Sequence, residues 1–228
     1  MSETTFFDPR ERLHFSFRAT PFRKFVVFLL GNIFKLFMKL EVQGAENLPS
    51  DGAVVLTANH VTNFDVIPMQ LSIPRPIFFM GKASLFKIPL FEAAIRDLGA
   101  FPVYRGEKDE WALRHAARVL ENGQVLGMFP EGTRSKGRGL SVAKTGSARL
   151  ALDANCPIVP MAVVGTDNFF KHFPRRNHVT IKLLPPILPK PGETPLALMD
   201  RVMFALAKEL PADMRGVYAE VPKGFTQN

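Results

Sequence analysis

Two short segments of this sequence carry reactive side chains at the ends of predicted strands. In the first, NHVTNFD, a histidine and an aspartate have four residues between them and directly follow the apolar run at 53–59. Residues five apart on a continuous helix point about 140° away from each other, so His60 and Asp65 can meet only across a turn. A histidine oriented by a carboxylate is the pair that removes a proton from a hydroxyl near neutral pH. The HX4D spacing alone is weak evidence, and a structural histidine bonded to its neighbour is the alternative.

The second segment, FPEGTRS, follows the apolar run at 124–130 and precedes a polar, glycine-rich loop. Cations also follow two other predicted strands. The carboxyl ends of parallel strands share one edge of a sheet, where ligand sites form, and arginine forks at that edge suit a phosphate group. For each cation taken singly, a solvated surface charge is the alternative. The substrate-binding candidates are Lys82, Arg105, Glu131, Gly132, Thr133 and Arg134.

The elements that must position these residues alternate between short apolar runs and helical patterns. Strands are predicted at 53–59, 76–80, 100–104, 124–130, 157–165 and 178–184. Helices are predicted at 66–72, 85–99, 109–123, 142–155 and 195–210, with Asp65 as the N-cap of the first. This alternation predicts an α/β fold with a mostly parallel central sheet flanked by helices.

Composition narrows the class of partner. The chain has 228 residues, a formal net charge of +8 and a single cysteine, Cys156, so no intrachain disulfide can form. The basic charge favours an anionic partner. Nine of the 21 phenylalanines lie between Phe6 and Phe37, where basic residues also outnumber acidic ones. Apolar and basic residues together at one end indicate an anionic phospholipid membrane rather than nucleic acid.

The N-terminal region predicts an amphipathic membrane-binding helix. Thr20 reads as its N-cap and Pro21 as its first residue, and the pattern continues to Leu40. Its uncharged stretch, 25–34, is short against the roughly 20 residues of a spanning helix, so we expect the helix to lie in the headgroup layer. A core helix and a true membrane span are the alternatives. We accordingly divide the chain into a membrane-association segment, 1–40, and an α/β domain, 41–228.

Four segments in this order, NHVTNFD, FPVYRG, FPEGTRS and IVPMAV, resemble the four sequence blocks of the glycerolipid acyltransferase family. Within that family the lysophosphatidate (1-acylglycerol-3-phosphate) acyltransferases are the most similar. The resemblance covers Asn59 to Val163 and extends to chain size and the basic N-terminus. Thr62 stands where the family commonly has serine, which keeps the hydroxyl.

The resemblance implies a reaction and a role for each residue. His60 would be the general base for the free sn-2 hydroxyl of lysophosphatidate, and Asp65 would hold its tautomer. Arg105 and Arg134, with Lys82, would bind the acceptor phosphate, and the neighbouring residues of FPEGTRS would shape that site. The donor would be acyl-CoA or acyl-[acyl carrier protein], the product phosphatidate, and no metal or cofactor would be needed. A peripheral enzyme of phospholipid biosynthesis, on the cytoplasmic face of a membrane, is the resulting expectation.

Other functions stay open at this stage. The same acyl transfer could use a lyso-aminolipid or glycerol 3-phosphate as acceptor. The segment GLSVAKT, at 139–145, is one residue away from a nucleotide-binding P-loop, with Ala143 where the second glycine should be. A P-loop-like NTPase and a non-catalytic membrane adaptor are therefore the alternatives from other classes.

Overall fold

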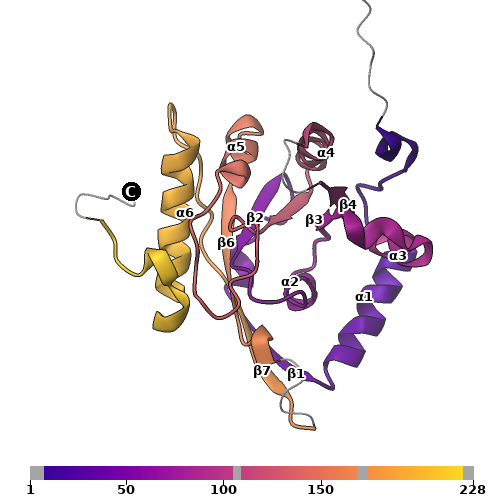
Figure 1. The fold of residues 1–228 in the computed structure, drawn as a ribbon, viewed down its shortest axis with the longest axis horizontal. Helices are drawn as coiled ribbons and strands as arrows, with labels where there is room; N and C mark the ends of the chain where they lie inside the picture. Colours follow the sequence, from indigo (N-terminus) through magenta and orange to yellow (C-terminus); the bar gives the residue numbers. More distant parts are fainter. Residues whose placement is uncertain (1–7, 105–108, 169–173, 223–228) are drawn as a thin grey trace, which may run out of the picture.

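The computed structural model describes residues 8–104, 109–168 and 174–222 (Figure 1). The strands are β1 (Met38–Gln43), β2 (Val54–Ala58), β3 (Ile77–Lys82), β4 (Ala100–Val103), β5 (Val125–Met128), β6 (Ile158–Val164) and β7 (Asn177–Leu183). The α-helices are α1 (Pro21–Phe34), α2 (Val66–Ser72), α3 (Pro89–Asp97), α4 (Glu110–Glu121), α5 (Gly146–Asp153) and α6 (Pro195–Glu209). Short 3₁₀ helices are η1 (Pro9–Arg12), η2 (Ala45–Asn47), η3 (Ala83–Lys87), η4 (Thr166–Asn168), η5 (Ala212–Met214) and η6 (Gly216–Tyr218).

The strands form one sheet in the order β1-β7-β6-β2-β5-β3-β4. All neighbouring pairs are parallel except β6 and β7, which run antiparallel. The predicted α/β fold with a mostly parallel sheet is therefore confirmed. Because β2, β3, β4, β5 and β6 run in the same direction, their carboxyl ends lie along one edge, as a ligand site requires.

Helices cover both faces of the sheet, and successive residues of β2 point into different cores. Val55 belongs to the larger cluster, which α4, α5 and α6 cover. Val54 and Leu56 belong to the second cluster, with Met69 of α2. Figure 1 shows α6 on one flank and α1 on the other. Burial on both faces explains why β2 reads as a continuous apolar run.

The N-terminal helix is shorter than predicted. Its start is correct, since Thr20 Oγ1 accepts a hydrogen bond from the Arg23 amide and Pro21 is the first helical residue. Its predicted end at Leu40 is wrong, because α1 ends at Phe34 and β1 pairs in parallel with β7. Apolar and polar residues alternate through β1 (MKLEVQ), which is the period of a strand. The domain boundary expected after residue 40 thus falls inside a strand of the sheet.

Two buried residues attach α1 to the α/β domain. The Arg23 guanidinium is enclosed and donates to Gln70 Oε1 at 2.8 Å and to the Ile77 carbonyl at 2.7 Å. Burial lowers the pKa of Arg23 to about 10. Gly31 allows close contact with α2, since a Cβ there would lie 3.0 Å from Leu71 Cδ2. The helix therefore packs on the domain through one face.

The opposite side of α1 carries apolar side chains in solvent. The exposed residues of this outer face are Phe22, Phe25, Phe28, Leu29, Ile33 and Leu36, the last just beyond the helix. Lys24 and Lys35 are also exposed. Within the described ranges, no helix has the length and the apolar content needed to cross a membrane.

The residues before α1 pack against α4. Arg10 donates to both carboxylate oxygens of Asp109, at 2.6 and 2.8 Å, and its guanidinium lies 4.4 Å from the centre of the Trp111 ring. His115 is enclosed by aromatic rings, with centroids 4.6 to 5.3 Å away: Phe15, Phe17, Phe101 and Trp111. Desolvation in this aromatic enclosure lowers the pKa of His115 from 6.5 to about 4.

This enclosure predicts a loss of stability in mild acid. Between pH 6.5 and about pH 4, His115 binds a proton in the unfolded chain but not in the folded one. The free energy of unfolding should therefore decrease as the pH is lowered through this window, by at most about 1.4 kcal/mol per pH unit from this group. Urea unfolding between about pH 5 and pH 7 measures the slope.

The variant His115→Gln should flatten that slope, whereas His14→Gln, at an exposed histidine, should leave it unchanged. An identical slope in the wild-type protein and in His115→Gln would show that another group is responsible.

Candidate active site

His60 and Asp65 meet across a tight turn at the end of β2. The imidazole Nδ1 lies 2.8 Å from Asp65 Oδ2. The same carboxylate oxygen accepts hydrogen bonds from the main-chain amides of Val61 and Thr62, at 2.7 and 3.0 Å. Asp65 occupies the predicted N-cap position of α2 but makes no side-chain cap bond to the helix. Its carboxylate instead points back over the turn and holds the histidine.

The orientation of the ring leaves one nitrogen available as a base. An ionised carboxylate only accepts, so Nδ1–H is the donor to Asp65 and Nε2 carries the lone pair. The His60 ring stacks on Phe129 at a centroid distance of 4.0 Å and an interplanar angle of 17°. The side chain is 12% exposed while that of Asp65 is fully buried. The result is a held, partly accessible imidazole backed by a carboxylate, which is the arrangement of a general base.

Glu131 joins the second segment to the first. Its Oε1 accepts from the His60 main-chain amide at 3.0 Å, and its Oε2 accepts from the amide and hydroxyl of Ser141 at 3.0 and 3.2 Å. The Ser135 amide donates to the His60 carbonyl at 2.8 Å. Glu131 is buried, and both of its oxygens are engaged by the protein itself. In this geometry Glu131 braces the turn that carries His60.

The rest of FPEGTRS forms an exposed loop after β5. Gly132 has a φ of 67°, in the left-handed region that favours glycine. A Cβ at that position would lie 3.2 Å from Lys144 Nζ, so the lysine side chain passes directly over this glycine. Thr133, Arg134 and Lys144 are exposed. Lys144 therefore lies over Gly132, the residue after Glu131, and Arg134 follows two residues later on the same loop.

Lys144 was not predicted as a site residue, because the sequence presents it only within the segment that resembles a P-loop. The structure argues against nucleotide binding there. A P-loop holds phosphate with free main-chain amides. The Ala143 amide donates to Tyr218 Oη at 3.1 Å, and the Lys144 amide donates to the Pro130 carbonyl at 2.9 Å.

The sheet places one of the two remaining predicted cations. Lys82 is exposed at the end of β3, a parallel neighbour of β5, so it lies on the same sheet edge as the loop with Arg134. Arg105 lies outside the described residues.

Two residues that the sequence analysis did not single out, Asn59 and Thr166, connect the turn to β6 and to the segment directly after it. The Asn59 side chain donates to the Val163 carbonyl and accepts from the Val163 amide, both at 2.8 Å. The Thr166 hydroxyl donates to Asp65 Oδ1 at 2.6 Å. These partners are more than 100 residues away along the chain, so no local pattern could indicate them.

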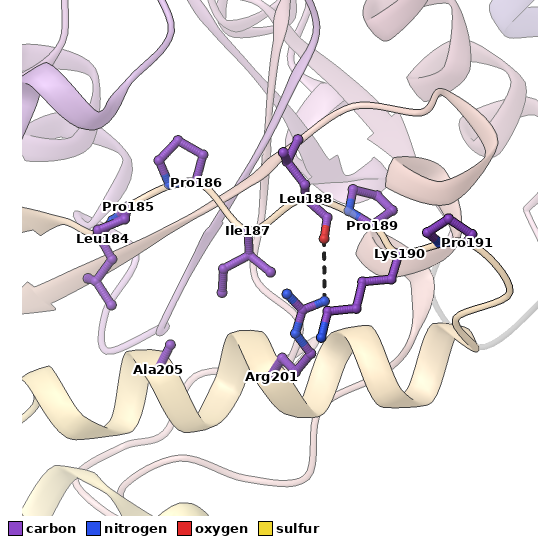
Figure 2. Close-up of a pocket in the computed structure, with 10 residues that line it drawn as sticks. All are labelled: Leu184, Pro185, Pro186, Ile187, Leu188, Pro189, Lys190, Pro191, Arg201 and Ala205. Carbon is purple, nitrogen blue, oxygen red and sulfur yellow. Dashed lines mark hydrogen bonds between the residues drawn. The ribbon is translucent and has the colours of Figure 1, made fainter. Parts of the chain in front are cut away.

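A separate hollow of about 520 Å³ lies between the proline-rich segment after β7 and α6 (Figure 2). In it Arg201 donates to the Leu188 carbonyl at 3.3 Å. Ile187 bridges to Ile158, the first residue of β6, whereas the candidate site lies at the carboxyl end of the strands. A seven-residue strand is roughly 20 Å long, so this hollow does not belong to the site.

Together the fold and the site define an α/β protein with a hydrogen-bonded histidine–aspartate pair at the carboxyl edge of its sheet. The family model described as Acyltransferase matches residues 39–164, more than half of the chain. The chain belongs to this acyltransferase family, which confirms the resemblance carried by the four blocks.

Individual proteins similar to this chain are also acyltransferases. The chain is 32% identical over 164 residues to the 1-acyl-sn-glycerol-3-phosphate acyltransferase of Escherichia coli, covering 70% of this chain and 67% of that one. It is 32% identical to the protein of the same name from Borreliella burgdorferi, over 58% of this chain, and spans 54% of that relative's length. The crystal structure of the 1-acyl-sn-glycerophosphate acyltransferase PlsC from Thermotoga maritima matches with a TM-score of 0.64 and 28% identity, over 82% of this chain and 80% of that one.

Proposed function

We propose that this protein transfers a fatty acyl group from an acyl thioester to the sn-2 hydroxyl of lysophosphatidate, which gives phosphatidate. The observation that carries the proposal is the hydrogen bond between His60 Nδ1 and Asp65 Oδ2, because it makes Nε2 the basic nitrogen. The names of the relatives supply the acceptor, since they are 1-acylglycerol-3-phosphate acyltransferases.

In the proposed reaction, His60 Nε2 takes the proton of the acceptor hydroxyl while its oxygen attacks the thioester carbonyl. Asp65 stabilises the imidazolium that forms. The tetrahedral intermediate then collapses, the carbon–sulfur bond breaks, and His60 returns the proton to the leaving thiolate. General-base action of this kind contributes roughly 10²- to 10⁴-fold to the rate.

Direct transfer is favoured over an acyl-enzyme on cysteine. Cys156 is buried, and burial raises the pKa of its thiol to about 11. A thiolate is the nucleophilic form, so this thiol is poorly suited to attack. The proposed chemistry also draws on no metal ion and on no cofactor besides the acyl-CoA or acyl-carrier-protein donor.

Exposed cations are the proposed partners of the acceptor phosphate. Arg134 and Lys82 are carried to the same sheet edge as His60, and Lys144 adds a third cation over Gly132. Guanidinium groups bind phosphate through paired, charge-assisted hydrogen bonds. Arg105, which lies outside the described residues, belongs to the same proposed set on the resemblance alone.

The outer face of α1 is proposed to hold the enzyme on the cytoplasmic face of an anionic bilayer. Phe25 and Phe28 are 59% and 71% exposed, and Lys24 and Lys35 stand beside them. Apolar side chains flanked by cations bind the headgroup boundary of such membranes. Docking through Arg23 and Gly31 would keep the domain, and thus His60, beside a membrane-resident acceptor.

The variant His60→Ala should abolish acyl transfer with the fold intact, because no base then receives the hydroxyl proton. A loss of kcat by about 10²-fold or more is expected. The control His178→Ala removes an exposed histidine from β7 and should keep full activity. Turnover is measured with lysophosphatidate and both thioester donors by mass spectrometry, and retained kcat in His60→Ala would remove the base assignment.

The variant Arg134→Ala should raise the KM for lysophosphatidate by roughly tenfold and change kcat little, since a charge-assisted bond to phosphate is lost. Lys190→Ala, at an exposed lysine of the hollow in Figure 2, is the charge-matched control. Equal use of an acceptor without phosphate by the wild-type protein would contradict the phosphate-binding role.

The double variant Phe25→Ser/Phe28→Ser should weaken sedimentation with phosphatidylglycerol-containing vesicles by about tenfold or more, because two large apolar side chains are lost from the interface. Leu188→Ser/Leu196→Ser, at residues 63% and 59% exposed, is the matched control. Surface substitution tests membrane binding without disturbing the fold, whereas deletion of 1–40 would remove half of β1 and the buried Arg23. Unchanged vesicle binding would disprove the membrane role of α1.

A further inference from the structure

The Asp65 carboxylate has one hydrogen-bond donor from a distant part of the chain. Among the described residues, its other donors come from residues 60–62 of the same turn. The distant donor is the Thr166 hydroxyl, which lies 2.6 Å from Oδ1, the oxygen that does not face the imidazole. Both Thr166 and Asp65 are buried, at 1% and 0% exposure.

This bond is the strongest candidate for fixing the carboxylate. An ionised carboxylate has no proton to give, so Thr166 donates. Bonds from a hydroxyl to an ionised oxygen are typically about 2.5–2.7 Å long and are stronger than neutral ones. The other contacts to Oδ1, from the amide and hydroxyl of Thr62, are both 3.2 Å long. Thr166 is therefore the closest donor to that oxygen.

The backbone at Gly165 places the Thr166 hydroxyl beside the turn that carries His60 and Asp65. Thr166 follows β6 directly after Gly165, which has a φ of 90°. A Cβ at Gly165 would collide with the His178 carbonyl oxygen, and the Asn177 side chain donates to the Gly165 carbonyl. Thr166 lies just beyond the residues that the family model matches, which end at 164.

We propose that Thr166 is a positioning residue for the general base. Its bond to Oδ1 fixes the rotation of the Asp65 carboxylate so that Oδ2 faces Nδ1 of His60. It thereby keeps Nε2 of His60 as the basic nitrogen. Thr166 acts through Asp65 and touches no substrate. The inference rests on the proposed acyl transfer for its kinetic test but not for its spectroscopic one.

Three variants of Thr166 isolate the contribution of the hydroxyl. Thr166→Val replaces it with a methyl group of similar size, and Thr166→Ser keeps it while the methyl is lost. We expect Thr166→Val to lower kcat by roughly 10- to 100-fold with little change in KM, and Thr166→Ser to stay close to the wild-type protein. Thr166→Ala should resemble Thr166→Val, and thermal unfolding monitors the fold of each variant. Equal activity of the alanine and serine variants would overturn the proposal.

A double-mutant cycle with Asp65 tests whether the Thr166 hydroxyl acts through that carboxylate or independently of it. In an Asp65→Asn background, the further change Thr166→Val should lower kcat by much less than it does in the wild-type protein. The same fold-loss in both backgrounds would mean that the hydroxyl acts without Asp65, which would also overturn the proposal.

A readout that needs no activity keeps this inference distinct from the proposed function. The Nδ1 proton shared with a carboxylate gives a downfield ¹H NMR resonance, which His60→Ala assigns by its loss. Thr166→Val should shift or broaden this resonance, and Thr166→Ser should preserve it. A wild-type protein without acyl transfer would refute the proposed function alone, whereas an unchanged resonance in Thr166→Val would refute the positioning role.

Discussion

The burial of the Asp65 carboxylate is the constraint on which the site depends. An ionised carboxylate without water costs several kcal/mol unless the protein supplies donors. Here the donors are two main-chain amides, two hydroxyls and the imidazole of His60. Satisfying one buried charge therefore also determines the path of residues 60–62 and the orientation of the His60 ring.

A second buried carboxylate plays a complementary part. Asp65 holds the His60 side chain, and Glu131 holds the His60 main chain while it binds Ser141 on the far side of its own loop. The two carboxylates come from different segments but converge because β2 and β5 are adjacent and parallel. The histidine is thus fixed at both its backbone and its ring, and general-base catalysis benefits from such preorganisation because less reorganisation is needed on reaction.

The helix α1 combines two opposite surfaces in fourteen residues. Its inner side contributes the buried Arg23 and the close approach at Gly31, while its outer side keeps phenylalanines in solvent. A helix that is apolar nearly all round normally needs cover on every side. The described part of the domain covers only one side of α1, and the remaining apolar surface is the one proposed above to contact a membrane.

Local patterns in the sequence predicted the order and type of the strands and α-helices apart from β1, because apolar periodicity and caps act within a few residues. They predicted α2 at 66–72, and they showed that His60 and Asp65 could meet only across a turn, which is how the structure joins them. The helix end at Phe34 was missed because the long apolar run hid the alternating pattern of β1. The burial of Glu131, the path of Lys144 over Gly132 and the bond from Thr166 to Asp65 became visible only in the folded chain. These contacts join residues brought together by strand order and loop path, and hydrogen bonds between segments far apart in the chain leave no periodic signal in either one.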